Sequence, residues 1–267
     1  MPDFVYDEEV AVRYDAAVPL QDGEVEFYLE LAREAEASAS GGRTLEVTCG
    51  NGRVAVPLAQ AGIRLVGLDI SPAMLAIART KSAGLPNVEW VEGDMRSFDL
   101  GEEFGLVYIP IGSFQLMLSV EDQLATLRCI YRHLAPGSRL AFEVENPNLV
   151  AIAEWLTTKK GTYQRHPQRD YTHPETGRQV RSWGSAEYHP SVQQRVGHGF
   201  TEELDEGLVV VRREYGKPLT VRYFYRYEME HLLARCGYEI EAMYGDLRKN
   251  EYRATSPDMI WVARRPS

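Results

Sequence analysis

Residues 43–147 alternate short apolar runs with longer amphipathic stretches, and this alternation sets the predicted fold. The predicted strands cover residues 44–48, 63–69, 88–93, 104–112 and 138–146, and the predicted helices cover residues 53–62, 72–84 and 120–137. Ser71 and Pro72 are typical of a helix start, and Pro136 and Gly137 indicate where the last of these helices ends. Strands that alternate with helices in this way predict right-handed crossovers and a parallel sheet with helices on both faces.

The remainder of the chain has other patterns. Two helical segments precede the alternation, the second from Glu24 to about Ser38. Residues 159–226 consist of short polar and aromatic runs separated by turn signals, which predicts an inserted antiparallel layer. A helix over 227–236 and strands over 238–245 and 258–265 follow, and we expect the two strands to close the sheet edge as an antiparallel pair.

These patterns predict an α/β fold with a doubly wound, mostly parallel seven-stranded sheet and an inserted antiparallel β layer. The expected divisions are an N-terminal helical segment (1–42), a nucleotide-binding core (43–158), the β insertion (159–226) and a C-terminal helix with a strand pair that completes the core (227–267). The insertion is interpreted either as a lid over the substrate or as a homodimer interface.

Composition narrows the class of protein. The chain has 267 residues and a formal net charge of −10, which is a poor electrostatic match for nucleic acid or an anionic membrane. The three cysteines are far apart and form no metal-ligand spacing, so we expect reduced thiols and no metal site. We also expect no membrane span and no secretory signal, and hence a soluble, cytoplasmic protein.

The most informative segment is residues 45–53, Leu-Glu-Val-Thr-Cys-Gly-Asn-Gly-Arg, between the first strand and its helix. Open α/β sheets bind ligands beyond the carboxyl ends of their strands, and Gly50 and Gly52 let the backbone approach a ligand closely. Asp69 ends the second strand, where a carboxylate can accept hydrogen bonds from both hydroxyls of a ribose. Asp94, after the third strand, can accept from an adenine amino group while Met95 packs on the ring.

The same segment also satisfies the dinucleotide-binding spacing G-x-G-x-x-G/A from Gly50 to Ala55. Glu46 favours a different cofactor, because its carboxylate would repel a pyrophosphate and suits a cationic amino group and a sulfonium. The alternative interpretation of Glu46 is a solvated charge at a strand end.

Four segments in this order, LEVTCGNGRVAVPLA, VGLDISPAMLAIA, VEGDM and FGLVYIPIGSFQ, resemble the successive motifs of class I S-adenosylmethionine methyltransferases. More narrowly, they are similar to the bacterial small-molecule group that includes the amino-sugar N,N-dimethyltransferases. The resemblance extends from about Tyr6 to Pro147 and is weaker near the end of the chain. It implies a Rossmann-like fold, S-adenosyl-L-methionine as cofactor, S-adenosyl-L-homocysteine as product and a small-molecule methyl acceptor.

The resemblance also implies roles for individual residues. Glu46 and the loop Thr48, Cys49, Gly50, Asn51 and Gly52 would hold the methionine portion of the cofactor. Asp69 would bind the ribose with Ile70 against the adenine, Asp94 and Met95 would hold the adenine, Ile109 would lie where substrate enters, and Tyr14 would close over the cofactor. Met74 and Arg96 complete the expected cofactor set.

Thr48 departs from the family pattern, in which the loop usually begins with glycine. A β-branched residue is stiffer and does not readily adopt a positive φ. Because Gly50 and Gly52 remain, we expect cofactor binding to survive with a slightly altered loop.

Methyl transfer from a sulfonium needs alignment and exclusion of water more than it needs a catalytic triad. The catalytic candidates are Tyr14, Gln115, Glu145, His166, His173 and Tyr225. Further candidates for acceptor contact are Ser113, Asn146, His189, His198 and Tyr223. Tyr223, Tyr225 and Tyr227 alternate with basic residues and Phe224, which predicts a strand with one aromatic face.

Three functions follow from these residues. The first is a methyltransferase that acts on a nitrogen or oxygen of a small molecule. The second is an NAD-dependent oxidoreductase, and the third is a non-catalytic protein that binds S-adenosylmethionine. The sequence leaves open the identity of the acceptor, the catalytic base and the oligomeric state.

Overall fold

The seven-stranded sheet is built from the apolar runs of the core and the last two strands of the chain. The computed structural model describes residues 6–38 and 42–267. The strands are β1 (Thr44–Val47), β2 (Leu65–Asp69), β3 (Val88–Glu92), β4 (Phe104–Ile109), β5 (Leu134–Glu145), β12 (Glu239–Tyr244) and β13 (Asp258–Arg264). Their order is β12-β13-β5-β4-β1-β2-β3, in which β1 to β5 are parallel and β13 is antiparallel to both of its neighbours, β5 and β12. The predicted fold class and the closing strand pair are confirmed.

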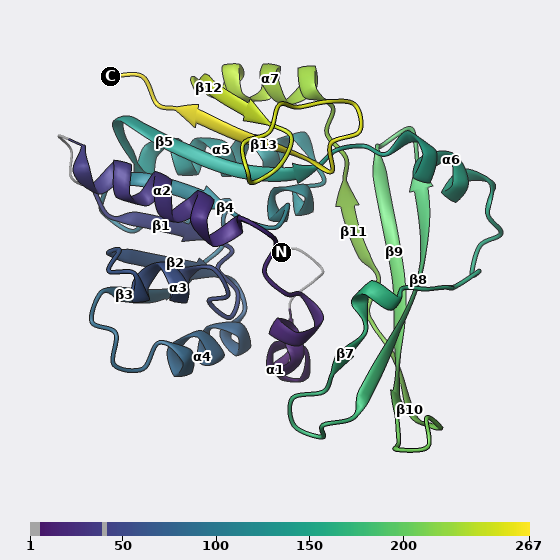
Figure 1. The fold of residues 1–267 in the computed structure, drawn as a ribbon. Coiled ribbons are helices and arrows are strands. Elements are labelled where there is room, and N and C mark those ends of the chain that lie inside the picture. The colour runs from purple at the N-terminus through teal and green to yellow at the C-terminus, as the bar shows by residue number, and fades with distance from the viewer. Residues whose placement is uncertain (1–5, 39–41) are drawn as a thin grey trace.

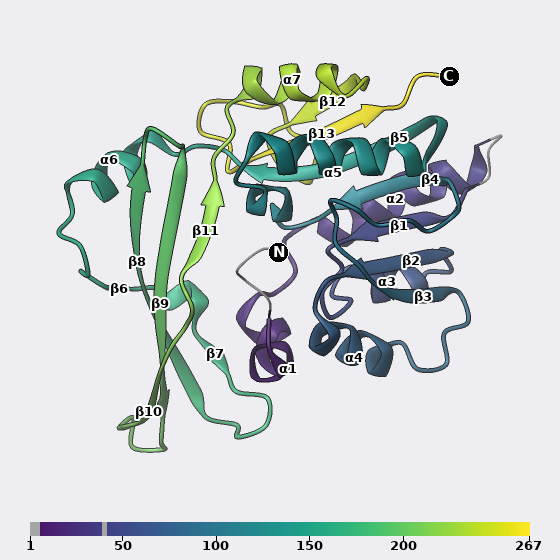
Figure 2. The same ribbon diagram turned by 180° about the vertical axis from the view of Figure 1, so that it is seen from behind.

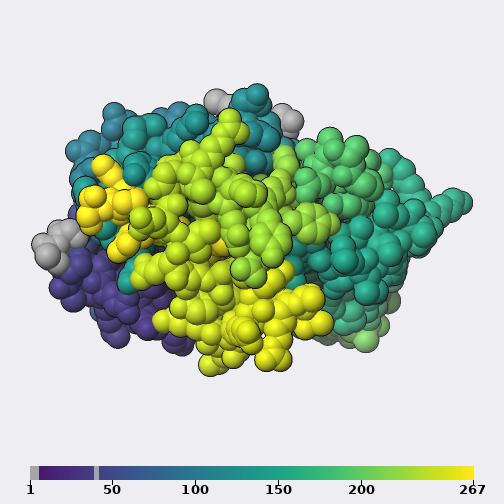
Figure 3. All heavy atoms as spheres, turned by 90° about the horizontal axis from the view of Figure 1, so that it is seen from above, coloured from purple at the N-terminus to yellow at the C-terminus, as the bar shows by residue number. Residues whose placement is uncertain are grey.

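Helices cover both faces of this sheet because the strands are apolar on both sides. On one face, α2 (Glu24–Ala37) and α3 (Ala55–Gln60) bury Phe27, Tyr28 and Leu58 against the strands. On the other, α5 (Val120–His133) and α7 (Arg226–Arg235) contribute Leu127, Ile130 and Leu233 to a second apolar cluster. The helix α4 (Pro72–Lys81) packs on β2 and β3. Seen from above in Figure 3, the C-terminal elements, coloured light green to yellow, cover the core.

The predicted insertion forms a separate antiparallel sheet. Its strands are β6 (Gln164–Arg165), β7 (Tyr171–Thr172), β8 (Gln179–His189), β9 (Gln194–Leu204), β10 (Val210–Tyr215) and β11 (Leu219–Arg222). The long hairpin of β8 and β9 forms the centre, and the order is β10-β9-β8-β6, with β11 on β9 and β7 on β8. We call this unit the second sheet.

The helix α1 (Glu8–Ala17) lies between the core and the second sheet, as both ribbon views show (Figures 1 and 2). The carboxyl ends of β1, β2 and β4 point toward this helix (Figure 1). A further helix, α6 (Leu149–Thr157), follows β5 and packs on β8. The sequence pattern did not separate α6 from the core. No helix among residues 6–38 and 42–267 has the length and apolar character of a membrane span.

Two predicted elements are wrong in detail. The helix α5 ends at His133, and Pro136 and Gly137 lie inside β5, where the pairing with β4 shifts register. This irregularity tolerates a proline without an N–H, and Gly137 takes a φ of 81°. The predicted aromatic strand is also absent, because β11 ends at Arg222 and Tyr225 instead precedes α7 as its N-cap. The side chain of Tyr223 is buried, whereas Tyr225 and Tyr227 are exposed.

Candidate functional site

The loop after β1 is joined to the end of β2 by the carboxylate of Asp69. The backbone N–H of Gly50 donates to Oδ2 of Asp69 at 2.8 Å, and the N–H of Ser71 donates to Oδ1 at 2.8 Å. Burial raises the pKa of Asp69, and hydrogen bonds from the backbone N–H groups of Ser71, Gly50 and Ile70 oppose that shift. A carboxylate has about four acceptor positions, so with three N–H donors Asp69 can still accept a hydroxyl group.

The loop keeps a left-handed backbone at three positions. Thr48, Gly50 and Gly52 have φ values of 64°, 53° and 76°. Gly52 is also required for packing, because a Cβ there would lie 2.8 Å from side-chain atoms of Trp90 and Val56. Thr48 has a left-handed backbone although its β-branched side chain disfavours this conformation. The expectation that the loop differs slightly from the family pattern stays a prediction.

Glu46 lies beneath this loop and is only 1% exposed. The hydroxyl of Tyr108 donates to its Oε2. Burial raises the pKa of Glu46 from 4.5 to about 8, against the opposing effects of the Tyr108 hydrogen bond and the Arg53 charge. The alternative of a solvated charge at a strand end is therefore wrong.

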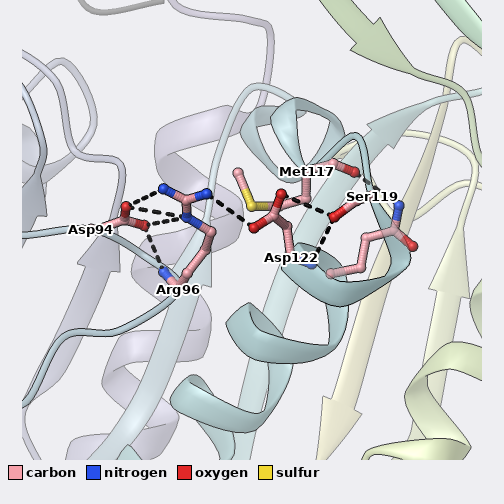
Figure 4. A network of polar contacts seen from close by, with 6 residues as sticks. Asp94, Arg96, Met117, Ser119 and Asp122 are labelled. Atoms are coloured by element: carbon pink, nitrogen blue, oxygen red, sulfur yellow. Dashed lines mark hydrogen bonds and ion pairs between the residues drawn. The ribbon is translucent and has the colours of Figure 1, made fainter. Parts of the chain in front are cut away.

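Asp94 belongs to a charged network that Figure 4 shows. Nε of Arg96 donates to Oδ1 of Asp94 at 2.9 Å, and Nη1 of Arg96 donates to Oδ1 of Asp122 at 2.9 Å. Ser119 caps α5 by accepting from the N–H of Asp122. The Arg96 guanidinium holds the pKa of Asp94 below its usual value, so the carboxylate is charged and only accepts hydrogen bonds.

The other predicted cofactor residues take different positions. Cys49, Asn51, Met74, Met95 and Ile109 are buried, and Ile70 is half-buried. Met95 and Ile109 belong to the apolar cluster under α5. Met74 lies under the loop, with its Cε 3.5 Å from where a Cβ of Gly50 would stand.

The N-terminal segment covers the loop. The Oγ of Ser71 donates to the carbonyl of Tyr6 at 2.8 Å, and Nδ2 of Asn51 donates to Oδ1 of Asp15 at 2.9 Å. The rings of Tyr6 and Tyr14 meet edge to face with centroids 5.3 Å apart. Burial raises the pKa of Tyr14, the Arg53 charge lowers it and the Asp69 charge raises it further.

Two candidate residues, Gln115 after β4 and Glu145 at the end of β5, connect the core to the second sheet. Oε1 of Gln115 accepts from the N–H of Glu145 at 2.9 Å, and Nε2 of Gln115 donates to the carbonyl of Arg222 at 3.0 Å. Gln115 is therefore a connector. The Glu145 side chain is half-exposed and lies 3.4 Å from Nη2 of Arg195.

The histidines are dispersed. His173 is buried, and its Nδ1 accepts from the backbone of Glu175 and Thr176, so it stabilises a turn. His198 lies 3.4 Å from Glu187 on the second sheet. His166 lies over Gly184, and burial together with the Arg169 charge lowers its pKa, so its imidazole is neutral near neutral pH.

Sequence reasoning did not identify the buried polar groups behind the site. Arg53, directly after the glycine loop, forms a buried ion pair with Glu24 of α2. Glu143 on β5 is 1% exposed and accepts from the backbone of Ile111 at 2.7 Å. A glutamate between the apolar residues Phe142 and Val144 was the available signal.

Known proteins with similar sequences include methyltransferases. Residues 44–137 match the family model described as "Methyltransferase domain". The cypemycin N-terminal methyltransferase of a Streptomyces species is 36% identical over 107 residues, which are 40% of this chain and 43% of the relative. The dTDP-4-amino-2,3,4,6-tetradeoxy-D-glucose N,N-dimethyltransferase of Saccharopolyspora spinosa is 34% identical over 99 residues, 37% of this chain and 39% of the relative. The chain spans about half the length of the curated relatives that it matches.

Solved structures match nearly the whole chain. The CcbJ methyltransferase of Streptomyces caelestis has a TM-score of 0.75 at 22% identity and covers 98% of this chain and 100% of its own. CalS10, an amino pentose methyltransferase of Micromonospora echinaspora, has a TM-score of 0.68 at 24% identity and covers 98% and 99%. Residues 44–137 thus match a methyltransferase domain model, the solved structures share the Rossmann-like fold, and the resemblance to the class I family is confirmed.

Proposed function

We propose that this chain is an S-adenosylmethionine-dependent methyltransferase that acts on a nitrogen or oxygen of a small molecule. The observation that carries the proposal is the hydrogen bond from the Gly50 N–H to Asp69. A dinucleotide site uses the backbone amides of its glycine loop for the pyrophosphate, whereas here a carboxylate occupies one of them. A pyrophosphate at this loop would also lie next to the Asp69 carboxyl group, which already accepts from the Gly50 N–H.

The polar groups of the site fit this cofactor. Asp69 would accept a ribose hydroxyl, Asp94 would accept the adenine amino group, and Tyr14 on α1 would exclude water from the reacting groups. When bound, S-adenosylmethionine supplies an electrophilic methyl group that is displaced in line with its sulfur. Alignment of this kind can supply roughly 7–11 kcal/mol of rate enhancement.

An amine acceptor that arrives protonated must lose its proton, and a base contributes about 10²–10⁴-fold. His166 and Glu145 are the proposed proton acceptors, because one is a neutral imidazole and the other a half-exposed carboxylate at the end of β5. The relatives that act on amino sugars make a nucleoside diphosphate-linked amino sugar the first acceptor to test.

We further propose that residues 159–226 act as a lid on the acceptor side. Arg195 of β9 faces Glu145 of β5, and Glu214 of β10 pairs with Arg13 of α1. Both contacts favour a lid over the alternative, a homodimer interface. Light scattering of the purified protein tests this choice, and a dimer that dissociates on disruption of β8 or β9 would contradict it.

The first experiment is isothermal titration with S-adenosylhomocysteine. We expect micromolar binding to the wild-type protein and at least tenfold weaker binding to Asp69→Ala. Asp99→Ala is the matched control, because the Asp99 side chain is 90% exposed and precedes β4 at the opposite edge of the sheet. Binding of NADH in place of S-adenosylhomocysteine would establish the oxidoreductase alternative. Binding without turnover on any amine or hydroxyl acceptor would establish the non-catalytic one.

A further inference from the structure

The turn after β4 has a strained backbone at its centre. Ile111 and Gly112 have φ values of 56° and 64°, so two consecutive residues are left-handed. For a β-branched residue this conformation is strained, and it persists only where the surroundings hold it. Gly112 cannot be replaced without a shift, because a Cβ there would lie 2.8 Å from Oε1 of Gln115.

Glu143 holds this turn from the neighbouring strand. Its Oε1 accepts from the backbone N–H of Ile111 at 2.7 Å and from the hydroxyl of Tyr28 at 3.2 Å. The residue is 1% exposed. A buried carboxyl group is costly unless it is hydrogen-bonded. Here one of its hydrogen bonds is made with the backbone N–H of the strained residue Ile111.

The same carboxyl group connects to the cofactor side of the site. The ring of Tyr28 stacks on that of Tyr108 with centroids 4.4 Å apart, and Tyr108 donates to Glu46 beneath the loop after β1. The side chains Glu46, Tyr108, Tyr28 and Glu143 thus form a continuous buried row from β1 to β5. We call it the acid–tyrosine row.

On its other side, the turn is tied to the second sheet. Gln115 accepts from the N–H of Glu145 and donates to the carbonyl of Arg222 at the end of β11. The turn is therefore hydrogen-bonded to Glu143 through the Ile111 backbone and to the junction with the second sheet through Gln115. A displacement of this turn would reach the junction directly.

We propose that Glu143 is a positioning residue, which holds the Ile111–Gly112 turn in its strained form and so aligns the acceptor side of the site. As far as it concerns methyl transfer, this inference rests on the proposed function. Burial raises the pKa of Glu143 to about 8, so the group is protonated near neutral pH and glutamine is its close mimic. The role therefore needs the acceptor oxygen and not a negative charge.

Three variants of the full chain, each saturated with S-adenosylhomocysteine, test the proposal by amide hydrogen exchange. Glu143→Leu removes the acceptor oxygen, and we expect exchange of residues 111–116 to become at least tenfold faster. Glu143→Gln keeps the oxygen and is expected to leave exchange within twofold of wild type. Glu143→Leu with Ile111→Gly should recover slow exchange, because glycine takes the left-handed form without strain. Unchanged exchange in Glu143→Leu would overturn the proposal.

The functional readout is methyl transfer from S-adenosylmethionine to a thymidine diphosphate-linked 4-amino sugar. We expect Glu143→Leu to lower kcat/KM for the sugar at least tenfold with the dissociation constant of S-adenosylhomocysteine within twofold. The double variant should recover most of the loss. An equal loss of cofactor binding, not recovered by Ile111→Gly, would indicate general damage and overturn the role. If the wild-type protein shows no turnover, the proposed acceptor fails, while the exchange result still decides whether Glu143 holds the turn.

Discussion

At the scale of single residues, two β-branched residues at the carboxyl edge of the parallel sheet have a strained backbone. Thr48 follows β1 and Ile111 follows β4, and both are β-branched residues with a positive φ. Glycine would adopt either conformation without steric cost. The surrounding hydrogen bonds and packing therefore hold both turns against the preference of their own residues.

Thr48→Gly is expected to stabilise the protein. Relief of the backbone strain contributes about 1–3 kcal/mol, and the greater freedom of glycine in the unfolded chain offsets about 0.4–1 kcal/mol of it. A net gain of about 1 kcal/mol in the free energy of unfolding should appear in urea denaturation. Thr80→Gly, at an exposed helical position, is the control and should destabilise the protein. A loss of stability in Thr48→Gly comparable with the control would contradict strain at this position.

At the scale of elements, α1 is attached to both units of the molecule. Asp15 accepts from Asn51 of the loop after β1 and pairs with Lys81 of α4. Arg13 pairs with Glu214 of the second sheet, and Arg212 of the same strand pairs with Glu9. The helix is therefore placed by polar contacts on both sides, and its position over the loop after β1 depends on them.

Asp15→Ala removes both contacts of that residue with the core. Hydrogen bonds and partly exposed ion pairs of this kind contribute about 0.5–1 kcal/mol each, so we expect S-adenosylhomocysteine to bind about fivefold to thirtyfold more weakly. Titration calorimetry measures the change. Glu8→Ala, on an exposed residue of the same helix, should leave the affinity unchanged. Wild-type affinity in Asp15→Ala would show that α1 does not contribute to cofactor binding.

At the scale of the whole molecule, two buried carboxyl groups make stability depend on pH. The pKa values of Glu46 and Glu143 rise from 4.5 to about 8, in both cases chiefly because of burial. Between these values the folded protein keeps protons that the unfolded chain loses. The stabilisation is thus fully present below about pH 4.5 and is lost as pH rises to about 8, by up to ~1.4 kcal/mol per pH unit for each group.

Urea denaturation between pH 5 and 8 should therefore show a falling free energy of unfolding. The double variant Glu46→Gln with Glu143→Gln should show a flatter profile, because neither side chain titrates. Carboxylates with a lowered pKa, such as Asp94, act in the opposite sense at lower pH, so the stability maximum is expected at mildly acidic pH. Parallel profiles for the wild-type protein and the double variant would contradict the raised pKa values.

Much of the site was predictable because it is local in sequence. Gly50, Gly52 and Asp69 lie within one strand–helix–strand unit, and the loop and strand end that they form meet in space through the 2.8 Å bond from Gly50. The sequence did not predict the partners of Arg96 and Arg53, since Asp122 and Glu24 lie on other elements. Tyr223 and Tyr225 were misplaced because a chain segment that alternates polar and aromatic residues also fits a turn into a helix.

The sequence by itself determined the doubly wound sheet, since strands apolar on both faces must be covered by helices on both sides. It also determined the position of the glycine loop and of Asp69, because the carboxyl ends of parallel strands meet at one edge. Only the tertiary structure decided that Tyr28 meets Glu143, 115 residues away, and that Arg13 meets Glu214, 201 residues away. Such contacts depend on how elements pack, which neither local propensity nor periodicity encodes.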